Sequence, residues 1–144
     1  MRKLRIKFKD RPALIIHRAA FANNHLVYIG RANRAFRYPW GRSRIGYIGT
    51  TRKGARRVAS SAAWKGEELL FARGVTEVEF CILTCAKHPG VRTWIKLERA
   101  LIIRFREKYG AVPVGNISGK KMRWKDEARY FRLRRLDQLI EKLG

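Results

Sequence analysis

Acidic residues are scarce in this chain. Its 144 residues include 11 Asp and Glu against 34 Lys and Arg, which gives a formal net charge of +23 at pH 7. So many like charges repel one another in a folded domain unless a polyanion neutralises them. Nucleic acid is the usual partner of a chain with this balance, and an anionic membrane surface is the rival.

Cysteine and long apolar runs are also scarce. Cys81 and Cys85 share one apolar run and have no His or Cys pair at metal-binding spacing, so we expect free, buried thiols. This excludes a secreted disulfide scaffold and fits a cytosolic protein. No apolar stretch approaches the roughly 20 residues of a membrane span, and the first residues lack a signal-peptide run. We therefore expect an intracellular, cytoplasmic protein that associates with nucleic acid and with no membrane.

What is present is a globular composition with unevenly placed charge. Hydrophobic residues make up 46% of the chain, and residues 1–60 hold 16 Lys and Arg but a single acid, Asp10. This half mixes Arg with Tyr, Trp, Gly and Pro instead of forming a basic amphipathic helix, which suits a phosphate backbone better than a membrane. The alternative is a solvated loop with packed aromatics. The residues expected to contact nucleic acid, DNA more than RNA, are Arg31, Arg34, Arg37, Trp40, Arg42, Arg44, Arg52, Lys53 and Arg56.

The hydropathy pattern predicts an α+β fold. Short apolar or alternating runs predict strands at 25–30, 44–49 and 75–86, the first two joined by a polar, basic loop over residues 31–43. Helical spacing predicts a helix after Thr50-Thr51 that ends before Gly74, a strong helix at 92–109, and an amphipathic helix at 125–143. We expect a small antiparallel or mixed sheet of about three strands flanked by helices. An extra N-terminal hairpin is possible, built on Leu4–Phe8 and Leu14–Ile16.

A carboxylate and a pair of tyrosines stand out from this pattern. Glu98 lies within the apolar stripe of the 92–109 helix, where a carboxylate must be neutralised, paired or bound to a cation. It predicts either a salt bridge to an arginine or a ligand for Mg²⁺, which keeps several waters and takes phosphate as a further ligand. Tyr28 and Tyr47 each precede Ile-Gly on the first two strands, which predicts either cross-strand aromatic packing or close approach of a phosphate to the backbone.

In their order along the chain, these residues resemble the GIY-YIG nuclease family. In that family, strands carrying Gly-Ile-Tyr and Tyr-Ile-Gly are followed by a helix with an Arg, a third strand and a helix with a metal-binding Glu. Leu26-Val-Tyr28 stands in for the first motif, and Tyr47-Ile-Gly49 is the second motif intact. Arg57 follows Tyr47 at the family's spacing, Glu98 matches the Leu-Glu helix, and Asn116 lies in a segment similar to the family's Asn-containing one.

The resemblance implies a metal-dependent endonuclease. Glu98 would hold Mg²⁺ or Mn²⁺ against the scissile phosphate, and Arg57 would donate to a phosphate oxygen. Tyr47 or Tyr28 would contact or activate the attacking water, and Asn116 would orient the site or contact the backbone. The implied division is a basic N-terminal arm or hairpin (1–24), a GIY-YIG-like nuclease domain (25–117) and a C-terminal amphipathic helix packed on that domain (118–144).

The chain also departs from the family pattern. Leu26 replaces the first glycine, the loop between the two motifs is longer and more basic, and Ser61 stands where many members have a His. The missing histidine leaves the general base unassigned. Two alternatives therefore stay open, namely a catalytically inactive nucleic-acid-binding protein on the same fold and a basic component of a ribonucleoprotein assembly.

Overall fold

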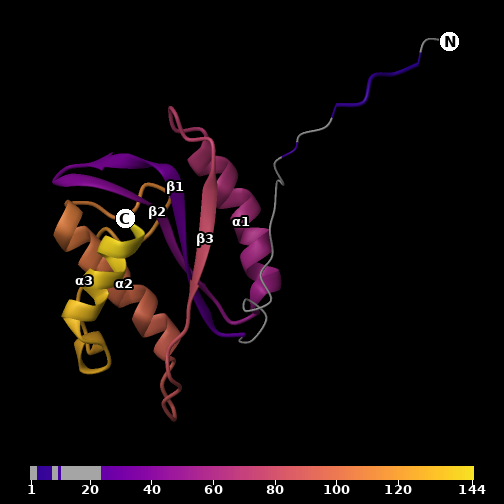
Figure 1. The fold of residues 1–144 in the computed structure, drawn as a ribbon. Coiled ribbons are helices and arrows are strands. Elements are labelled where there is room, and N and C mark those ends of the chain that lie inside the picture. Colours follow the sequence, from indigo (N-terminus) through magenta and orange to yellow (C-terminus); the bar gives the residue numbers. More distant parts are fainter. Residues whose placement is uncertain (1–2, 8–9, 11–23) are drawn as a thin grey trace.

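A single three-stranded sheet between helices organises the protein. The computed structural model describes residues 3–7, 10 and 24–144. All three strands are antiparallel, in the order β2-β1-β3, with α1 on one face and α2 and α3 on the other (Figure 1). The predicted α+β fold with a small flanked sheet is confirmed. The elements are β1 (Leu26–Tyr38), β2 (Gly41–Thr51), α1 (Ala55–Leu70), β3 (Val78–Leu83), α2 (Thr93–Tyr109), the 3₁₀ turn η2 (Glu127–Arg129) and α3 (Leu133–Leu143).

The first two strands form one long hairpin, so the prediction of a polar loop over residues 31–43 is wrong. β1 continues through this stretch to Tyr38, and a two-residue turn leads directly into β2. Buried Phe36 and Tyr38 flank exposed Arg37, which is the alternation of a strand with one wet face. The number of arginines and the proline in the turn concealed this alternation in the sequence.

The main core lies between the sheet and α2. Ile29, Ile45 and Ile48 are fully buried on this face, where they belong to one cluster with Leu101 and Phe105 of α2. These α2 residues include the periodic positions that predicted the helix, and its observed bounds agree with the prediction to within one residue.

A smaller cluster fills the opposite face of the sheet. Leu26 and Tyr28 of β1 are buried there beneath Val58 of α1, with Phe80 of β3 packed alongside. The third strand is shorter than the predicted 75–86, because only residues 78–83 pair with β1 in the ladder. Thr76 and Glu77 are instead bonded to Asn33 of the β1 bulge. Tyr28, one of the predicted catalytic residues, lies on this face of the sheet.

The C-terminal segment packs on α2, but the predicted helix over 125–143 is wrong in its first half. Only η2 and α3 are helical there. The side chain of Glu127 is 1% exposed, and it accepts hydrogen bonds from the Lys125 amide at 2.7 Å and from Arg99 Nε at 2.6 Å. These bonds hold the chain in a turn, and Arg132 is extended before α3 begins.

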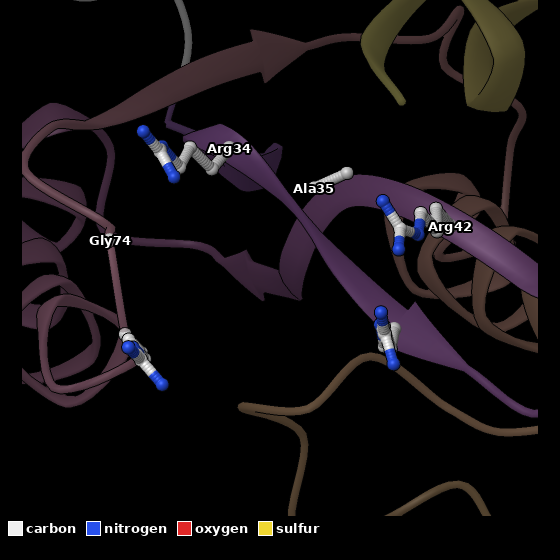
Figure 2. Close-up of a pocket in the computed structure, with 6 residues that line it drawn as sticks. Arg34, Ala35, Arg42 and Gly74 are labelled. Atoms are coloured by element: carbon white, nitrogen blue, oxygen red, sulfur yellow. The ribbon is translucent and has the colours of Figure 1, made fainter.

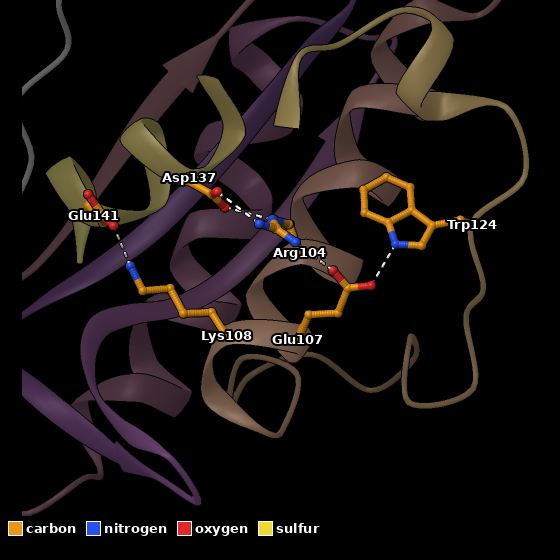
Figure 3. A network of polar contacts seen from close by, with 6 residues as sticks. All are labelled: Arg104, Glu107, Lys108, Trp124, Asp137 and Glu141. Atoms are coloured by element: carbon orange, nitrogen blue, oxygen red, sulfur yellow. Dashed lines mark hydrogen bonds and ion pairs between the residues drawn. The ribbon is translucent and has the colours of Figure 1, made fainter. Parts of the chain in front are cut away.

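Ion pairs fasten α3 to α2. Arg104 donates to both carboxylate oxygens of Asp137 at 2.7 and 2.9 Å, and Lys108 donates to Glu141 at 2.9 Å (Figure 3). The other side of α3 carries Leu136, which is buried in the main core. The C-terminal segment thus contributes to the main core between the sheet and α2.

Three smaller expectations have mixed outcomes. Residues 3–7 form no strand, and the second half of the possible hairpin, Leu14–Ile16, lies outside the described residues. Cys81 and Cys85 are free, although each is only partly buried. In the described ranges, no helix combines the length and the apolar character needed to cross a bilayer.

Candidate functional site

Tyr28 and Tyr47 lie side by side across the hairpin. Their ring centroids are 5.8 Å apart, and the register places Tyr28 opposite Gly49. A Cβ on Gly49 would lie 2.6 Å from the Tyr47 ring and 2.9 Å from the Tyr28 ring. The glycine of Tyr-Ile-Gly therefore makes room for the two rings, so aromatic packing accounts for this position without a phosphate.

The two tyrosines differ in accessibility. Tyr28 is 3% exposed beneath α1, whereas Tyr47 is partly exposed. Of the two residues predicted to contact the attacking water, Tyr47 is the one that a ligand can reach.

Glu98 of α2 acts electrostatically on Tyr47. Its negative charge is one of the smaller influences that raise the pKa of Tyr47, after burial and the neighbouring Tyr28. Burial raises the pKa of Glu98 itself from 4.5 to about 7, although the nearby charge of Arg99 opposes the shift. Arg99 is committed to Glu127, at 2.6 Å. No residue in the described part of the chain forms a hydrogen bond or ion pair with the Glu98 carboxylate.

Tyr47 stays a phenol at neutral pH. Burial raises its pKa above the ordinary value of 10, and the neighbouring Tyr28 and Glu98 raise it further. A hydroxyl in this state can donate a hydrogen bond to water or phosphate but does not take up a proton. This arrangement favours a positioning role for Tyr47 over the role of general base.

Asn116 clamps the free edge of β2. Its amide donates to the Ile48 carbonyl at 2.9 Å and accepts from the Ile48 amide at 3.0 Å, as a paired strand would. The next residue back, Gly115, donates to the Gly46 carbonyl at 2.7 Å. These bonds fix the residues on both sides of Tyr47, and the predicted role of Asn116 in a substrate site stays a prediction.

Arg57 lies in the first turn of α1 and is exposed. Of the predicted residues, the structure brings Tyr28 and Tyr47 into ring contact. Glu98 acts on Tyr47 through its charge, and no described contact joins Arg57 to any of these three residues. Arg52 and Lys53 are exposed just before α1, and the side chain of Arg56 lies outside what the structure describes.

The arginines of the hairpin fall into two groups. Arg31 is paired with Glu79 at 2.9 Å, and Arg44 donates to the Ala32 carbonyl at 2.6 Å, so both hold the sheet together. Arg34, Arg37 and Arg42 instead line an open hollow of about 560 Å³ together with Ala35, Arg73 and Gly74. Figure 2 shows Arg34 and Arg42 on the hairpin and Gly74 facing them from the segment between α1 and β3.

Three further residues join the predicted ones. Arg73 was not expected to contact a ligand, because nothing in the local sequence separates it from other surface arginines. His25 stacks on Trp94, with ring centroids 3.8 Å apart. Trp94 lies on α2, one helical turn before Glu98. Lys65 Nζ lies 5.2 Å from the Tyr47 ring centroid and donates to the Gly115 carbonyl at 2.9 Å. Helical spacing alone gives no signal for either contact, because each depends on a partner from another element.

The remaining aromatic of the predicted nucleic-acid surface is Trp40 at the hairpin turn. Its backbone amide donates to the Tyr109 carbonyl at 3.1 Å, and its ring lies over Gly110, where a Cβ would approach to 2.8 Å. The ring is still 70% exposed, so its outer face is open to a base or sugar.

The described residues contain no group of three or more His, Cys, Asp or Glu side chains able to share a metal ion. Neither a family model, nor a curated protein, nor a solved structure matches the chain, and the resemblance to GIY-YIG nucleases stays a prediction made from its residues.

Proposed function

We propose that the protein is a divalent-metal-dependent endonuclease that hydrolyses phosphodiester bonds in nucleic acid, DNA more than RNA. The proposal rests mainly on Glu98, a half-buried carboxylate of α2 that has no described partner and acts electrostatically on Tyr47. The chain has 34 Lys and Arg available as partners. A half-buried carboxylate left unpaired among so many cations is a costly feature unless a cation from solution occupies the position.

Mg²⁺ or Mn²⁺ fits the residues that are present. Either ion accepts one carboxylate and completes its coordination with waters and substrate phosphate. Bound there, it would stabilise the charge that develops on the phosphate and on the leaving oxygen. A cation beside Glu98 also opposes the effect of burial on its pKa and keeps the carboxylate ionised at neutral pH.

The chain's own groups would hold the substrate. Tyr47 keeps its proton and would donate a hydrogen bond to the attacking water or to a phosphate oxygen. Arg57, exposed at the start of α1, offers a planar pair of donors to a non-bridging oxygen. Asn116 acts through Ile48 and is a positioning residue.

A nucleic-acid-binding protein without catalysis is the alternative, and the burial of Tyr28 favours it. With 3% exposure, this hydroxyl does not reach a substrate, and the two rings then serve packing alone. The net charge of +23 would account for the binding, including binding within a ribonucleoprotein assembly.

Plasmid nicking separates the two functions. Purified protein is incubated with supercoiled DNA and Mg²⁺, with and without chelator, beside a Glu98→Gln variant. We expect nicking that needs both the metal and Glu98. Equal DNA binding by the two proteins without any cutting would support the binding protein instead.

The matched control is Glu67→Gln. Glu67 is an exposed acid on α1 without a described partner, so its removal changes the net charge by the same amount. We expect this variant to nick at the wild-type rate. Loss of nicking in both variants would indicate a general effect of charge and contradict the role of Glu98.

A further inference from the structure

A bulge in β1 creates a hollow that the regular strands would not form. Between Arg31 and Phe36 the pairing of β1 with β2 shifts register, so several residues of β1 stand opposite few of β2. The bulged Asn33 is tied to the segment before β3, because its side chain accepts from the Thr76 amide at 3.0 Å and donates to the Thr76 hydroxyl at 2.9 Å. The hairpin is thereby held against the end of the α1–β3 connection.

This attachment brings Arg34 over the backbone of Gly74. A Cβ on Gly74 would lie 3.1 Å from the Arg34 side chain, and Gly74 has a φ of 81°, in the left-handed region that favours glycine. Gly74 therefore permits both the turn and the close passage of the arginine stem. Arg73, the residue before it, faces the same hollow.

The other two arginines oppose each other across the hairpin. Arg37 and Arg42 are register partners, and like charges directly opposite one another destabilise a strand pair. Buried Tyr38, the neighbour of Arg37, packs on Phe105 of α2, so Arg37 points away from α2. Four guanidinium groups thus line one hollow of about 560 Å³.

No carboxylate compensates this charge. The residues that line the hollow include no acid, and in the described ranges none of the four arginine side chains forms an ion pair or hydrogen bond. The scarcity of acids does not explain this, because Arg31, three residues before Arg34 in sequence, is paired with Glu79. The four arginine side chains therefore repel one another, and an anion of several charges bound in the hollow would relieve this repulsion.

We propose that this hollow is a second phosphate site, which anchors the backbone of a nucleic-acid strand away from Tyr47 and Glu98. Arg37 is nine residues from Tyr28 along β1, which corresponds to roughly 25–30 Å of strand. Its role is to hold successive phosphates by paired guanidinium donors while the reaction takes place elsewhere. The proposal rests on the nucleic-acid substrate of the proposed function but not on its catalysis.

Binding without cleavage tests this site. A fluorescently labelled DNA duplex is titrated in chelator at several salt concentrations with wild type, Arg37→Gln/Arg42→Gln and the matched control Arg134→Gln/Arg135→Gln. The control removes the same charge from the exposed face of α3. We expect the hollow variant to bind about 10–100-fold more weakly, with the slope of log K against log salt reduced by about 1–2, and the control to stay within about threefold.

Equal losses in the two double variants would show that net charge alone binds the DNA and would overturn the proposal. An unchanged affinity of the hollow variant would overturn it as well. Inorganic tripolyphosphate serves as a competing ligand. If it binds the hollow while DNA affinity does not depend on Arg37 and Arg42, the hollow is a site for free polyphosphate, and the proposed nucleic-acid anchor is wrong. Circular dichroism confirms that each variant is folded.

The outcome is independent of the reaction. Glu67→Gln in the same assay should bind like wild type, since Glu67 lies outside both the hollow and the proposed catalytic site. If nicking proves absent but the hollow variant still loses affinity, the anchor stands and the endonuclease fails. If nicking is present but the hollow is not needed for affinity, the anchor fails and the endonuclease stands.

Discussion

Replacing Glu98 by Gln should stabilise the protein at neutral pH. Burial raises the pKa of this carboxyl to about 7 in the folded state, while the unfolded chain keeps the ordinary value near 4.5. Below pH 4.5 both states carry the proton and the carboxyl has no effect on stability. Between these values the unfolded chain binds fewer protons than the folded one, so the free energy of unfolding falls as pH rises. Above pH 7 the loss is complete.

The magnitude follows from the difference between the two pKa values. Each unit corresponds to about 1.4 kcal/mol, so the full cost of ionising the folded carboxyl is about 3 kcal/mol. The side chain is partly exposed, and screening by water reduces the expected gain of Glu98→Gln to about 2 kcal/mol at pH 8. At pH 4 the difference should vanish, because a glutamine resembles the protonated carboxyl that both states then carry.

Urea denaturation of the two proteins at pH 4 and pH 8 in chelator measures this effect. Adding Mg²⁺ or Mn²⁺ at pH 8 should then raise the stability of the wild type and leave Glu98→Gln unchanged, since an ion that binds the folded state stabilises it. A variant less stable than the wild type at pH 8 would show that Glu98 is a paired structural residue and would refute the reasoning.

Three other substitutions test the supports of the site. Gly49→Ala should cost about 1–3 kcal/mol of stability and reduce nicking, because the new methyl displaces both tyrosine rings; urea midpoints and nicking rates measure this. Asn116→Ala removes both hydrogen bonds to Ile48 and should cost about 1–3 kcal/mol, with faster amide exchange at Ile48 as the specific signature. Arg99→Met leaves the buried Glu127 without its cation and should cost about 3 kcal/mol by urea denaturation at pH 7. Wild-type midpoints in all three would contradict the contacts described.

The sequence predicted α2 well because its signals agree. A regular apolar stripe runs along one face, and Gly110, with a φ of 81°, ends the helix where the pattern stops. The pairing of Tyr28 with Tyr47 was also foreseeable, since both occupy strands joined in one hairpin. Local periodicity therefore predicted the structure correctly where the pattern of one helix or one hairpin determined it.

The hollow and the C-terminal turn could not be predicted from the sequence, because contacts between residues far apart in the chain form them. Arg73 reaches the hollow only through the bulge and the bonds of Asn33 to the segment before β3. The apolar spacing of residues 131–143 extends a helical pattern backward, but the buried bonds of Glu127 hold a turn there. Neither contact leaves a signal in the residues that surround it in sequence.

The central claim is that Glu98 holds a divalent cation beside Tyr47. A crystal of the protein soaked in Mn²⁺ and measured at a wavelength sensitive to manganese locates the ion directly by its anomalous scattering. We predict a peak roughly 2.0–2.3 Å from a carboxylate oxygen of Glu98, on the side that faces Tyr47. Manganese bound elsewhere with none at Glu98, or a Glu98 carboxylate closed onto a guanidinium, would contradict the claim.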